Sequence, residues 1–244
     1  MDYNSIKKAR YDQVWDAIEK KNLGADIYPE EAKLRIAADI VAGKGQYIFK
    51  LTRNDAQANN VSDFTLQDND IFVPNAMGVM IGITETATGV QKLYPYAPKR
   101  PAAGDSVYAA GFESDTIEKL YNGHLTWKMG TQILLNQYPM EKFKKVPRQQ
   151  GAFVLDSNDA AVSEQIQPEW SIDKCLELLM PKYTIAGNRD HYITVNFDAA
   201  SLSFPVTTGY TAQIVLFLDG FLVKGGCTTI DGKNAFGDAP ARFA

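Results

Sequence analysis

From residue 46 onward, hydrophobic and polar residues alternate with a period of two in several short runs. Such alternation is typical of β-strands that bury one face. The alternating runs are short, and turn-forming residues separate them, which favours antiparallel strands over a parallel sheet with intervening helices. The runs lie at residues 47–51, 64–66, 77–83, 125–129, 193–197 and 202–206.

One stretch, GYTAQIVLFLDGFLVKGG at residues 209–226, departs from this alternation. Residues 214–218 are apolar without a break, so this strand is expected to have no solvated face. Asp219-Gly220 follows and predicts a two-residue hairpin turn of type I′, with positive φ at both positions. A facing sheet would cover one side of the strand. The other side would be covered by the chain's own helices or by a neighbouring subunit.

Helical spacing of apolar residues predicts helices near the N-terminus and in the second half of the chain. Residues 5–20 have a helical stripe that contains Trp15, and residues 29–42 begin with Pro29 and two glutamates, a pattern typical of a helix start. A third helix is predicted at residues 171–180, where Pro181 would end it. Residues 139–145 are expected to form one or two helical turns.

These patterns predict a mainly β protein, an antiparallel β-sandwich of jelly-roll type with N-terminal helices and one or two short inserted helices. Three parts are expected. They are a helical N-terminal segment at residues 1–45, a β-sandwich domain at 46–231 and a C-terminal arm at 232–244.

The composition is that of an ordinary globular protein, with 45% hydrophobic and 22% charged residues in a chain of 244. The net charge of −4 does not suggest a nucleic-acid-binding surface. No apolar run reaches the roughly 18 residues that a membrane span needs, and no signal peptide is evident. We therefore expect synthesis and folding in the cytosol, with Cys175 and Cys227 as buried thiols rather than a disulfide framework, and with a single disulfide between them as the alternative.

Residues suited to catalysis or metal binding are few. The two histidines, His124 and His191, have no catalytic partners in the local sequence, and both are interpreted as strand-surface residues. No phosphate-binding loop or zinc spacing occurs, so no cofactor and no enzymatic activity are expected. Asp68–Asp70 and 156–159 offer oxygen ligands for calcium, but Asp and Asn also favour turns. A sugar-binding surface would use aromatic residues such as Tyr94, Tyr96, Tyr108 and Tyr121.

Two stretches resemble bacteriophage virion structural proteins of the capsid-type β-sandwich. They are YNGHLTWKMGTQILLNQYPMEKFKKVP at residues 121–147 and HYITVNFDAASLSFPVTTGYTAQIVLFLDGFLVKGG at 191–226. The resemblance lies in the short strands, the Asn- and Thr-rich turns, the aromatic strand edges and the apolar last strand. It implies a subunit that assembles in the host cytoplasm, is found in the virion, and associates with itself and with other virion proteins.

Three functions follow as hypotheses. The first is a structural subunit of a viral capsid or virion assembly, acting by self-association. The second is a carbohydrate- or cell-surface-binding β-module, and the third is an enzyme that acts on glycans with paired carboxylates. For the first hypothesis the expected interface residues are apolar groups of the helix, the last strand and the arm: Trp15, Phe221, Phe236 and Phe243.

Overall fold

The computed structural model describes residues 3–20, 27–41, 43–51, 60–62, 66–94, 121–144, 176–180, 183–197, 209–227, 229–230 and 233–234. Within this part the chain is mainly β, with antiparallel sheets, as the sequence predicted. The elements are α1 (Tyr3–Lys20), β1 (Pro29–Asp39), β2 (Gln46–Lys50), β3 (Asn60–Ser62), β4 (Ile71–Glu85), β5 (Gln91–Tyr94), β6 (His124–Met129), β7 (Gln132–Pro139), the 3-10 helix η1 (Met140–Phe143), β8 (Glu177–Leu178), β9 (Ile185–Ala186), β10 (His191–Asn196), β11 (Tyr210–Val223), β12 (Thr229–Ile230) and β13 (Lys233–Asn234).

A large sheet is built around the two longest strands, β4 and β11. Its strands follow the order β3-β1-β11-β4-β5, and β8 and β9 also pair with β4. β11 pairs with β4 along its whole length on one side, and with β1 from Gln213 to Val223 on the other. The apolar run of β11 is therefore the centre of the sheet, which explains why it needs hydrophobic cover on both faces.

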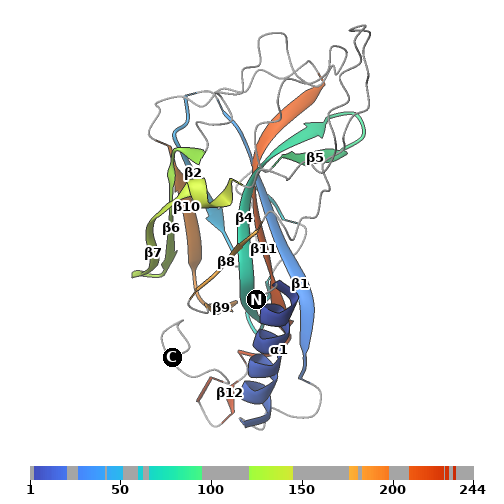
Figure 1. Ribbon diagram of the computed structural model, residues 1–244, viewed down its shortest axis with the longest axis vertical. Coiled ribbons are helices and arrows are strands. Elements are labelled where there is room, and N and C mark those ends of the chain that lie inside the picture. The colour runs from blue at the N-terminus through green and yellow to red at the C-terminus, as the bar shows by residue number, and fades with distance from the viewer. Residues whose placement is uncertain are drawn as a thin grey trace, which may run out of the picture.

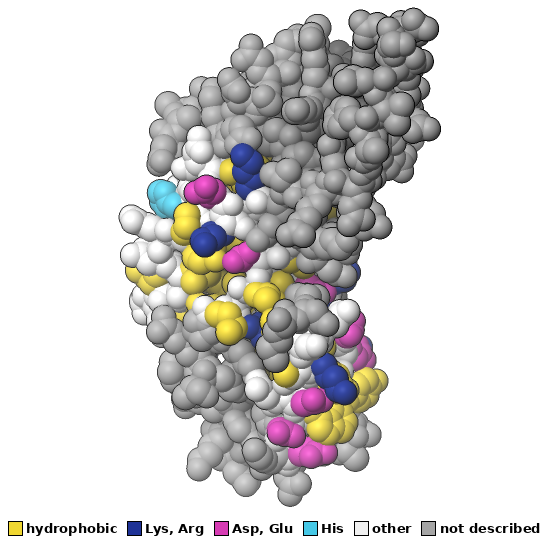
Figure 2. Space-filling model, viewed as in Figure 1, with side chains coloured by type: hydrophobic (Ala, Val, Ile, Leu, Met, Phe, Trp, Pro, Cys, Tyr) yellow, Lys and Arg dark blue, Asp and Glu magenta, His cyan; other side chains and the backbone are white. Residues whose placement is uncertain are grey.

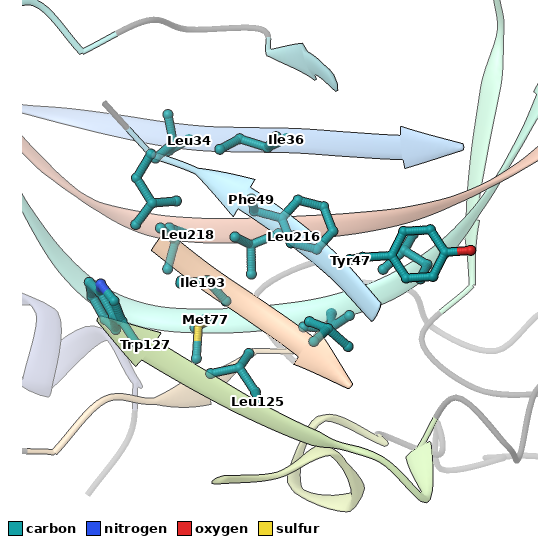
Figure 3. Packing of buried hydrophobic residues seen from close by; sticks show 14 of the residues in the cluster. Leu34, Ile36, Tyr47, Phe49, Met77, Leu125, Trp127, Ile193, Leu216 and Leu218 are labelled. Carbon is teal, nitrogen blue, oxygen red and sulfur yellow. The ribbon is translucent and has the colours of Figure 1, made fainter. Parts of the chain in front are cut away.

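A small sheet with the strand order β2-β10-β6-β7 faces the large sheet (Figure 1). Alternate residues of both sheets point toward one another and form a single hydrophobic core, as Figure 3 shows. The period-two alternation predicted these inward faces for β2, β4, β6 and β10, and the structure confirms it. The core contains Leu34, Ile36, Tyr47, Phe49, Met77, Leu125, Trp127, Ile193, Leu216 and Leu218.

The outer face of the large sheet is covered by segments of the same chain. Phe217 packs there with Ala76, Met80 and Leu176. Nearer the start of β1, helix α1 lies against the sheet (Figure 1). It places Val14 and Ile18 in a second cluster with strand residues Ile71, Val73, Phe221 and Val223.

A β-bulge in β4 changes which residues of that strand face the core. Asp219 pairs with Ala76 and Gly220 pairs with Pro74, so Asn75 is an extra residue without a partner in β11. Beyond the bulge the alternation of β4 is shifted by one position. Phe72 consequently joins the core between the sheets, whereas Ile71 and Val73 face helix α1.

The predicted hairpin at Asp219-Gly220 is wrong. Both residues lie inside the continuous strand β11, and Gly220 is not among the glycines with positive φ. A glycine is needed here for a different reason. A Cβ atom at Gly220 would lie 2.8 Å from Pro74 Cα and would also collide with the carbonyl of Val73, because the bulge brings the two backbones close together.

Two predicted helices are also corrected. Residues 29–39 form strand β1, whose residues Leu34, Ile36 and Ala38 face the core with a period of two. In the segment 171–180, residues 177–178 form strand β8, and residues 171–175 lie outside the described part of the chain. The short helical turn expected at 139–145 is confirmed as η1.

At both predicted boundaries of the chain, the structure places strands in segments that were expected to be a helical segment or an arm. Within the segment 1–45, residues 29–39 belong to the large sheet rather than to a helical segment. At the other boundary, β12 pairs with β13, which lies in the segment predicted as an arm. Among the described residues, no helix is both long enough and apolar enough to cross a membrane.

Candidate functional site

The predicted interface residues Trp15 and Phe221 belong to one aromatic column on the outer face of the large sheet. Phe221 of β11 is buried, and the ring of Tyr11 contacts it edge-on at a centroid distance of 5.4 Å. Tyr11 in turn stacks on Trp15 at 6.4 Å. Phe236 and Phe243 lie outside the described residues. The column runs from the buried strand through α1 to the surface.

Helix α1 therefore covers Phe221 within the same chain. A partner subunit had been an alternative cover for this apolar surface. The structure instead places Tyr11, Val14 and Ile18 on the sheet. Phe221 contributes to folding at this position, and Trp15 is the member of the column that a partner can reach.

Trp15 is 36% exposed, and its helix also carries three exposed acidic residues. Its indole Nε1 donates a hydrogen bond to Glu19 Oε1 at 2.7 Å, which fixes the ring at the surface. Asp12 and Asp16 are exposed on the same helix. Figure 2 shows hydrophobic side chains over α1 next to acidic ones. We name this region, composed of Asp12, Trp15, Asp16 and Glu19, the Trp15 surface.

A buried arginine fixes α1 to the bulge in β4. Arg10 is 4% exposed, and its Nη1 donates a hydrogen bond to the backbone carbonyl of Asn75 at 2.5 Å. Its Nη2 donates to the carbonyl of Leu179 and contacts Met180 Sδ at 3.2 Å. One guanidinium thus connects the helix, the bulge and the segment that follows β8.

The helical spacing of Arg10 relative to the apolar residues of α1 is a sequence signal for its burial. The residue precedes Val14 by one helical turn and Ile18 by two, so all three share one face of α1. Arginine is usually exposed, so a buried position for Arg10 is not the default expectation. A charged residue in the middle of an apolar stripe is a reason to look for buried acceptors.

Ion pairs add to this attachment. Lys7 Nζ lies 2.9 Å from Glu31 Oε2 of β1 and 3.6 Å from Asp219 Oδ2 of β11. The Asp219 side chain is almost fully buried, so its charge needs this compensation. At the rim, Lys224 Nζ lies 2.8 Å from Glu30 Oε2. The hydrogen bond between these two groups lowers the pKa of Glu30 and raises the pKa of Lys224.

A network of polar side chains crosses the outer face of the large sheet near the start of β11. Gln213 donates to Asp39 Oδ1 at 2.7 Å and accepts from Thr84 Oγ1 at 2.9 Å. Gln91 Nε2 donates to Thr84 Oγ1 at 3.0 Å, and Arg35 of β1 donates to Gln91. Because the chain of hydrogen bonds joins β1, β11, β4 and β5, it favours one register of these strands.

The two histidines differ from each other. His124 is half-buried on the face of β6 opposite Leu125 and Trp127, as predicted. His191 was also expected at a strand surface, and this prediction is wrong, because its side chain is 0% exposed. It shares the inward face of β10 with Ile193 and Val195. Burial, and to a smaller extent the nearby charge of Arg189, lower the pKa of His191 to about 3.

The candidates for calcium or sugar binding, and the cysteines, can be located where the chain is described, and there they contribute to turns or to the core. Residues 68–69 form a turn, and Asp70 Oδ1 accepts a hydrogen bond from the Gly225 amide at 3.0 Å. The described residues contain no group of three or more His, Cys, Asp or Glu that could hold a metal ion. Tyr121, a candidate for sugar binding, is buried with its hydroxyl 3.5 Å from the Val79 carbonyl. Cys227 is a buried free thiol whose pKa is raised by burial.

The remaining candidates cannot be placed in the same way. Tyr96, Tyr108, Cys175 and residues 156–159 lie outside the described residues, and Tyr94 is described only as the end of β5. No protein-family model, curated protein or solved structure matches the chain. The strand order and the Trp15 surface are therefore the features from which a function can be argued.

Proposed function

We propose that the chain is a structural subunit of a viral capsid or virion assembly, acts by self-association, and folds as a jelly-roll β-sandwich. The observation that supports this most directly is the order in which its strands pair. The Trp15 surface is the proposed contact with another subunit. Under this proposal the protein assembles in the host cytoplasm and resides in the virion.

A jelly roll is an eight-stranded antiparallel fold made of two Greek keys that wrap into two sheets. Wrapping a long antiparallel ribbon in this way pairs the first strand with the eighth, the second with the seventh, the third with the sixth and the fourth with the fifth. The matching pairs in this chain are β1 with β11, β2 with β10, β4 with β8 and β9 together, and β6 with β7.

Two further ladders also agree with this wrapping. It brings the eighth strand beside the third, and β11 pairs with β4. It brings the seventh strand beside the fourth, and β10 pairs with β6. Strands β3 and β5 then extend the large sheet at its two sides. A shared core between the two sheets is what a sandwich requires.

Jelly rolls occur in viral capsid subunits and also in lectin domains. The exposed Trp15 beside three acidic residues favours a protein partner over a sugar for this surface. Tryptophan is enriched where protein surfaces meet. The resemblance of residues 121–147 and 191–226 to phage virion proteins points the same way.

Electron microscopy of the purified chain tests the proposal. We expect shells, rings or other particles of uniform size at high protein concentration. A sample that contains single subunits at every concentration, and that binds an immobilised glycan on an array, would contradict the proposal and support the lectin-like alternative. The capsid-subunit and lectin-like functions are compatible with the same fold. The presence of particles or of glycan binding is therefore what distinguishes them.

A further inference from the structure

His191 occupies an unusual position in the core between the two sheets. It is the first residue of β10, and its side chain is 0% exposed. The ring lies 6.4 Å from the ring of Trp127 on the neighbouring strand β6, in an edge-on arrangement. Trp127 also contacts Tyr183, at 5.0 Å between ring centroids. An imidazole thus stands where most of its neighbours are apolar or aromatic.

Neither ring nitrogen of His191 has a hydrogen-bond partner within the part of the chain that the structure describes. The same holds there for the indole Nε1 of Trp127. A neutral imidazole can be accommodated in such a place at moderate cost. An imidazolium carries a full charge and two N–H donors, and burying it without acceptors costs far more.

Among the residues that the structure describes, the charges near this ring do not compensate a proton on it. Arg189, two residues before His191, repels it. The carboxylate of Asp190 is exposed and lies 3.9 Å from Lys50 Nζ, across the ladder on β2. On β6 the exposed Lys128 alternates with the inward-facing Trp127 and Met129. Tyr183, on the core side, adds a phenol and no negative charge at neutral pH.

We propose that His191 makes the packing between the two sheets sensitive to acid, so that protonation of its ring opens the core beside Trp127. At pH values well above 3 the ring holds a proton only when it reaches water. Opening of β10 away from the core supplies that access, and it exposes the indole of Trp127 at the same time. This inference concerns the fold of the single chain and is independent of whether the chain assembles.

The direction of the pH effect follows from linkage. The pKa of His191 is about 3 in the closed fold and 6.5 in an exposed imidazole, so the open form binds the proton more tightly. The stability of the closed form is therefore complete above about pH 6.5 and falls as the pH decreases toward 3. Between pH 7.5 and 4.5 the equilibrium constant for opening should rise by about 100-fold from this residue alone.

Denaturant unfolding at a series of pH values tests the proposal in the wild type, His191→Phe and His124→Phe. Phenylalanine keeps an aromatic ring beside Trp127 and cannot titrate. His124 is the other of the two histidines in the chain and serves as the control. Between pH 7.5 and 4.5, we expect the unfolding equilibrium constant to rise by the same factor in the wild type and in His124→Phe. In His191→Phe this factor should be about 100-fold smaller. An unchanged pH dependence in His191→Phe would overturn the proposal.

A second measurement does not depend on any variant being folded. The imidazole proton resonances of the wild type report the protonation state of His191 by NMR across the same pH range. We expect the His191 ring to remain neutral as long as the native spectrum persists, and its protonation to coincide with loss of the native signals of Trp127. Protonation of His191 near pH 6.5 within an unchanged native spectrum would overturn the proposal, even if His191→Phe failed to fold.

Discussion

The guanidinium of Arg10 donates a hydrogen bond to the carbonyl of Asn75, the extra residue of the bulge in β4. The same carbonyl accepts a bond from the amide of Leu179 at 3.0 Å. A bulge interrupts the regular ladder, and here its carbonyl is satisfied by a helix and by a segment distant in sequence. The bulge is therefore the point where α1 and the segment after β8 are held on the large sheet.

Replacing Arg10 by Ala should destabilise the protein by about 2 kcal/mol, because buried carbonyl groups lose a charged donor. Denaturant unfolding with Lys8→Ala as the control measures this effect, since Lys8 is exposed on the same helix. Equal unfolding free energies for the two variants would show that Arg10 does not anchor α1.

Gly220→Ala should destabilise the fold through a collision with the backbone of β4 rather than through turn geometry. The new Cβ would lie 2.8 Å from Pro74 Cα. Gly89 provides a matched control, because it has φ of +70° and open space around its Cβ position. Thermal unfolding should show a greater loss for Gly220→Ala than for Gly89→Ala, whose cost is limited to about 1–2 kcal/mol of backbone strain. The reverse order would argue against the close approach at the bulge.

Trp15→Ala should reduce self-association and lower the melting temperature less than a core truncation does, because part of the Trp15 side chain is exposed at the surface of α1. Val14→Ala is the contrasting variant. Val14 is 3% exposed, so its truncation should lower the unfolding free energy by about 2 kcal/mol. Sedimentation velocity and calorimetry on both variants measure the two effects. If Trp15→Ala associates as strongly as the wild type, the Trp15 surface is not the subunit contact.

The sequence correctly predicted the strands in which one face packs against the core and alternate residues point toward it. Residues 47–51, 77–83, 125–129 and 193–197 alternate because one face meets the core, and period two alone was enough to identify that face. The same period of two, extended two residues before Ile193, places His191 inward.

The incorrect predictions arose where distant contacts outweigh local preference. In β1 the residues Leu34 and Ala38 fit a helical face as well as a strand face, and only the pairing with β11 decides between them. Asp219-Gly220 has the composition of a tight turn. Its glycine is required by the backbone of β4 and its aspartate pairs with Lys7 of α1, and neither contact can be read from the neighbouring residues.

The mass of the purified wild-type protein in solution tests the central proposal most directly. Light scattering should be recorded over a wide range of protein concentrations at neutral pH, where His191 is neutral. A structural subunit that self-associates should show a mass that rises with concentration to a multiple of the 27.0 kDa chain. A constant mass of 27.0 kDa at every concentration would contradict the account.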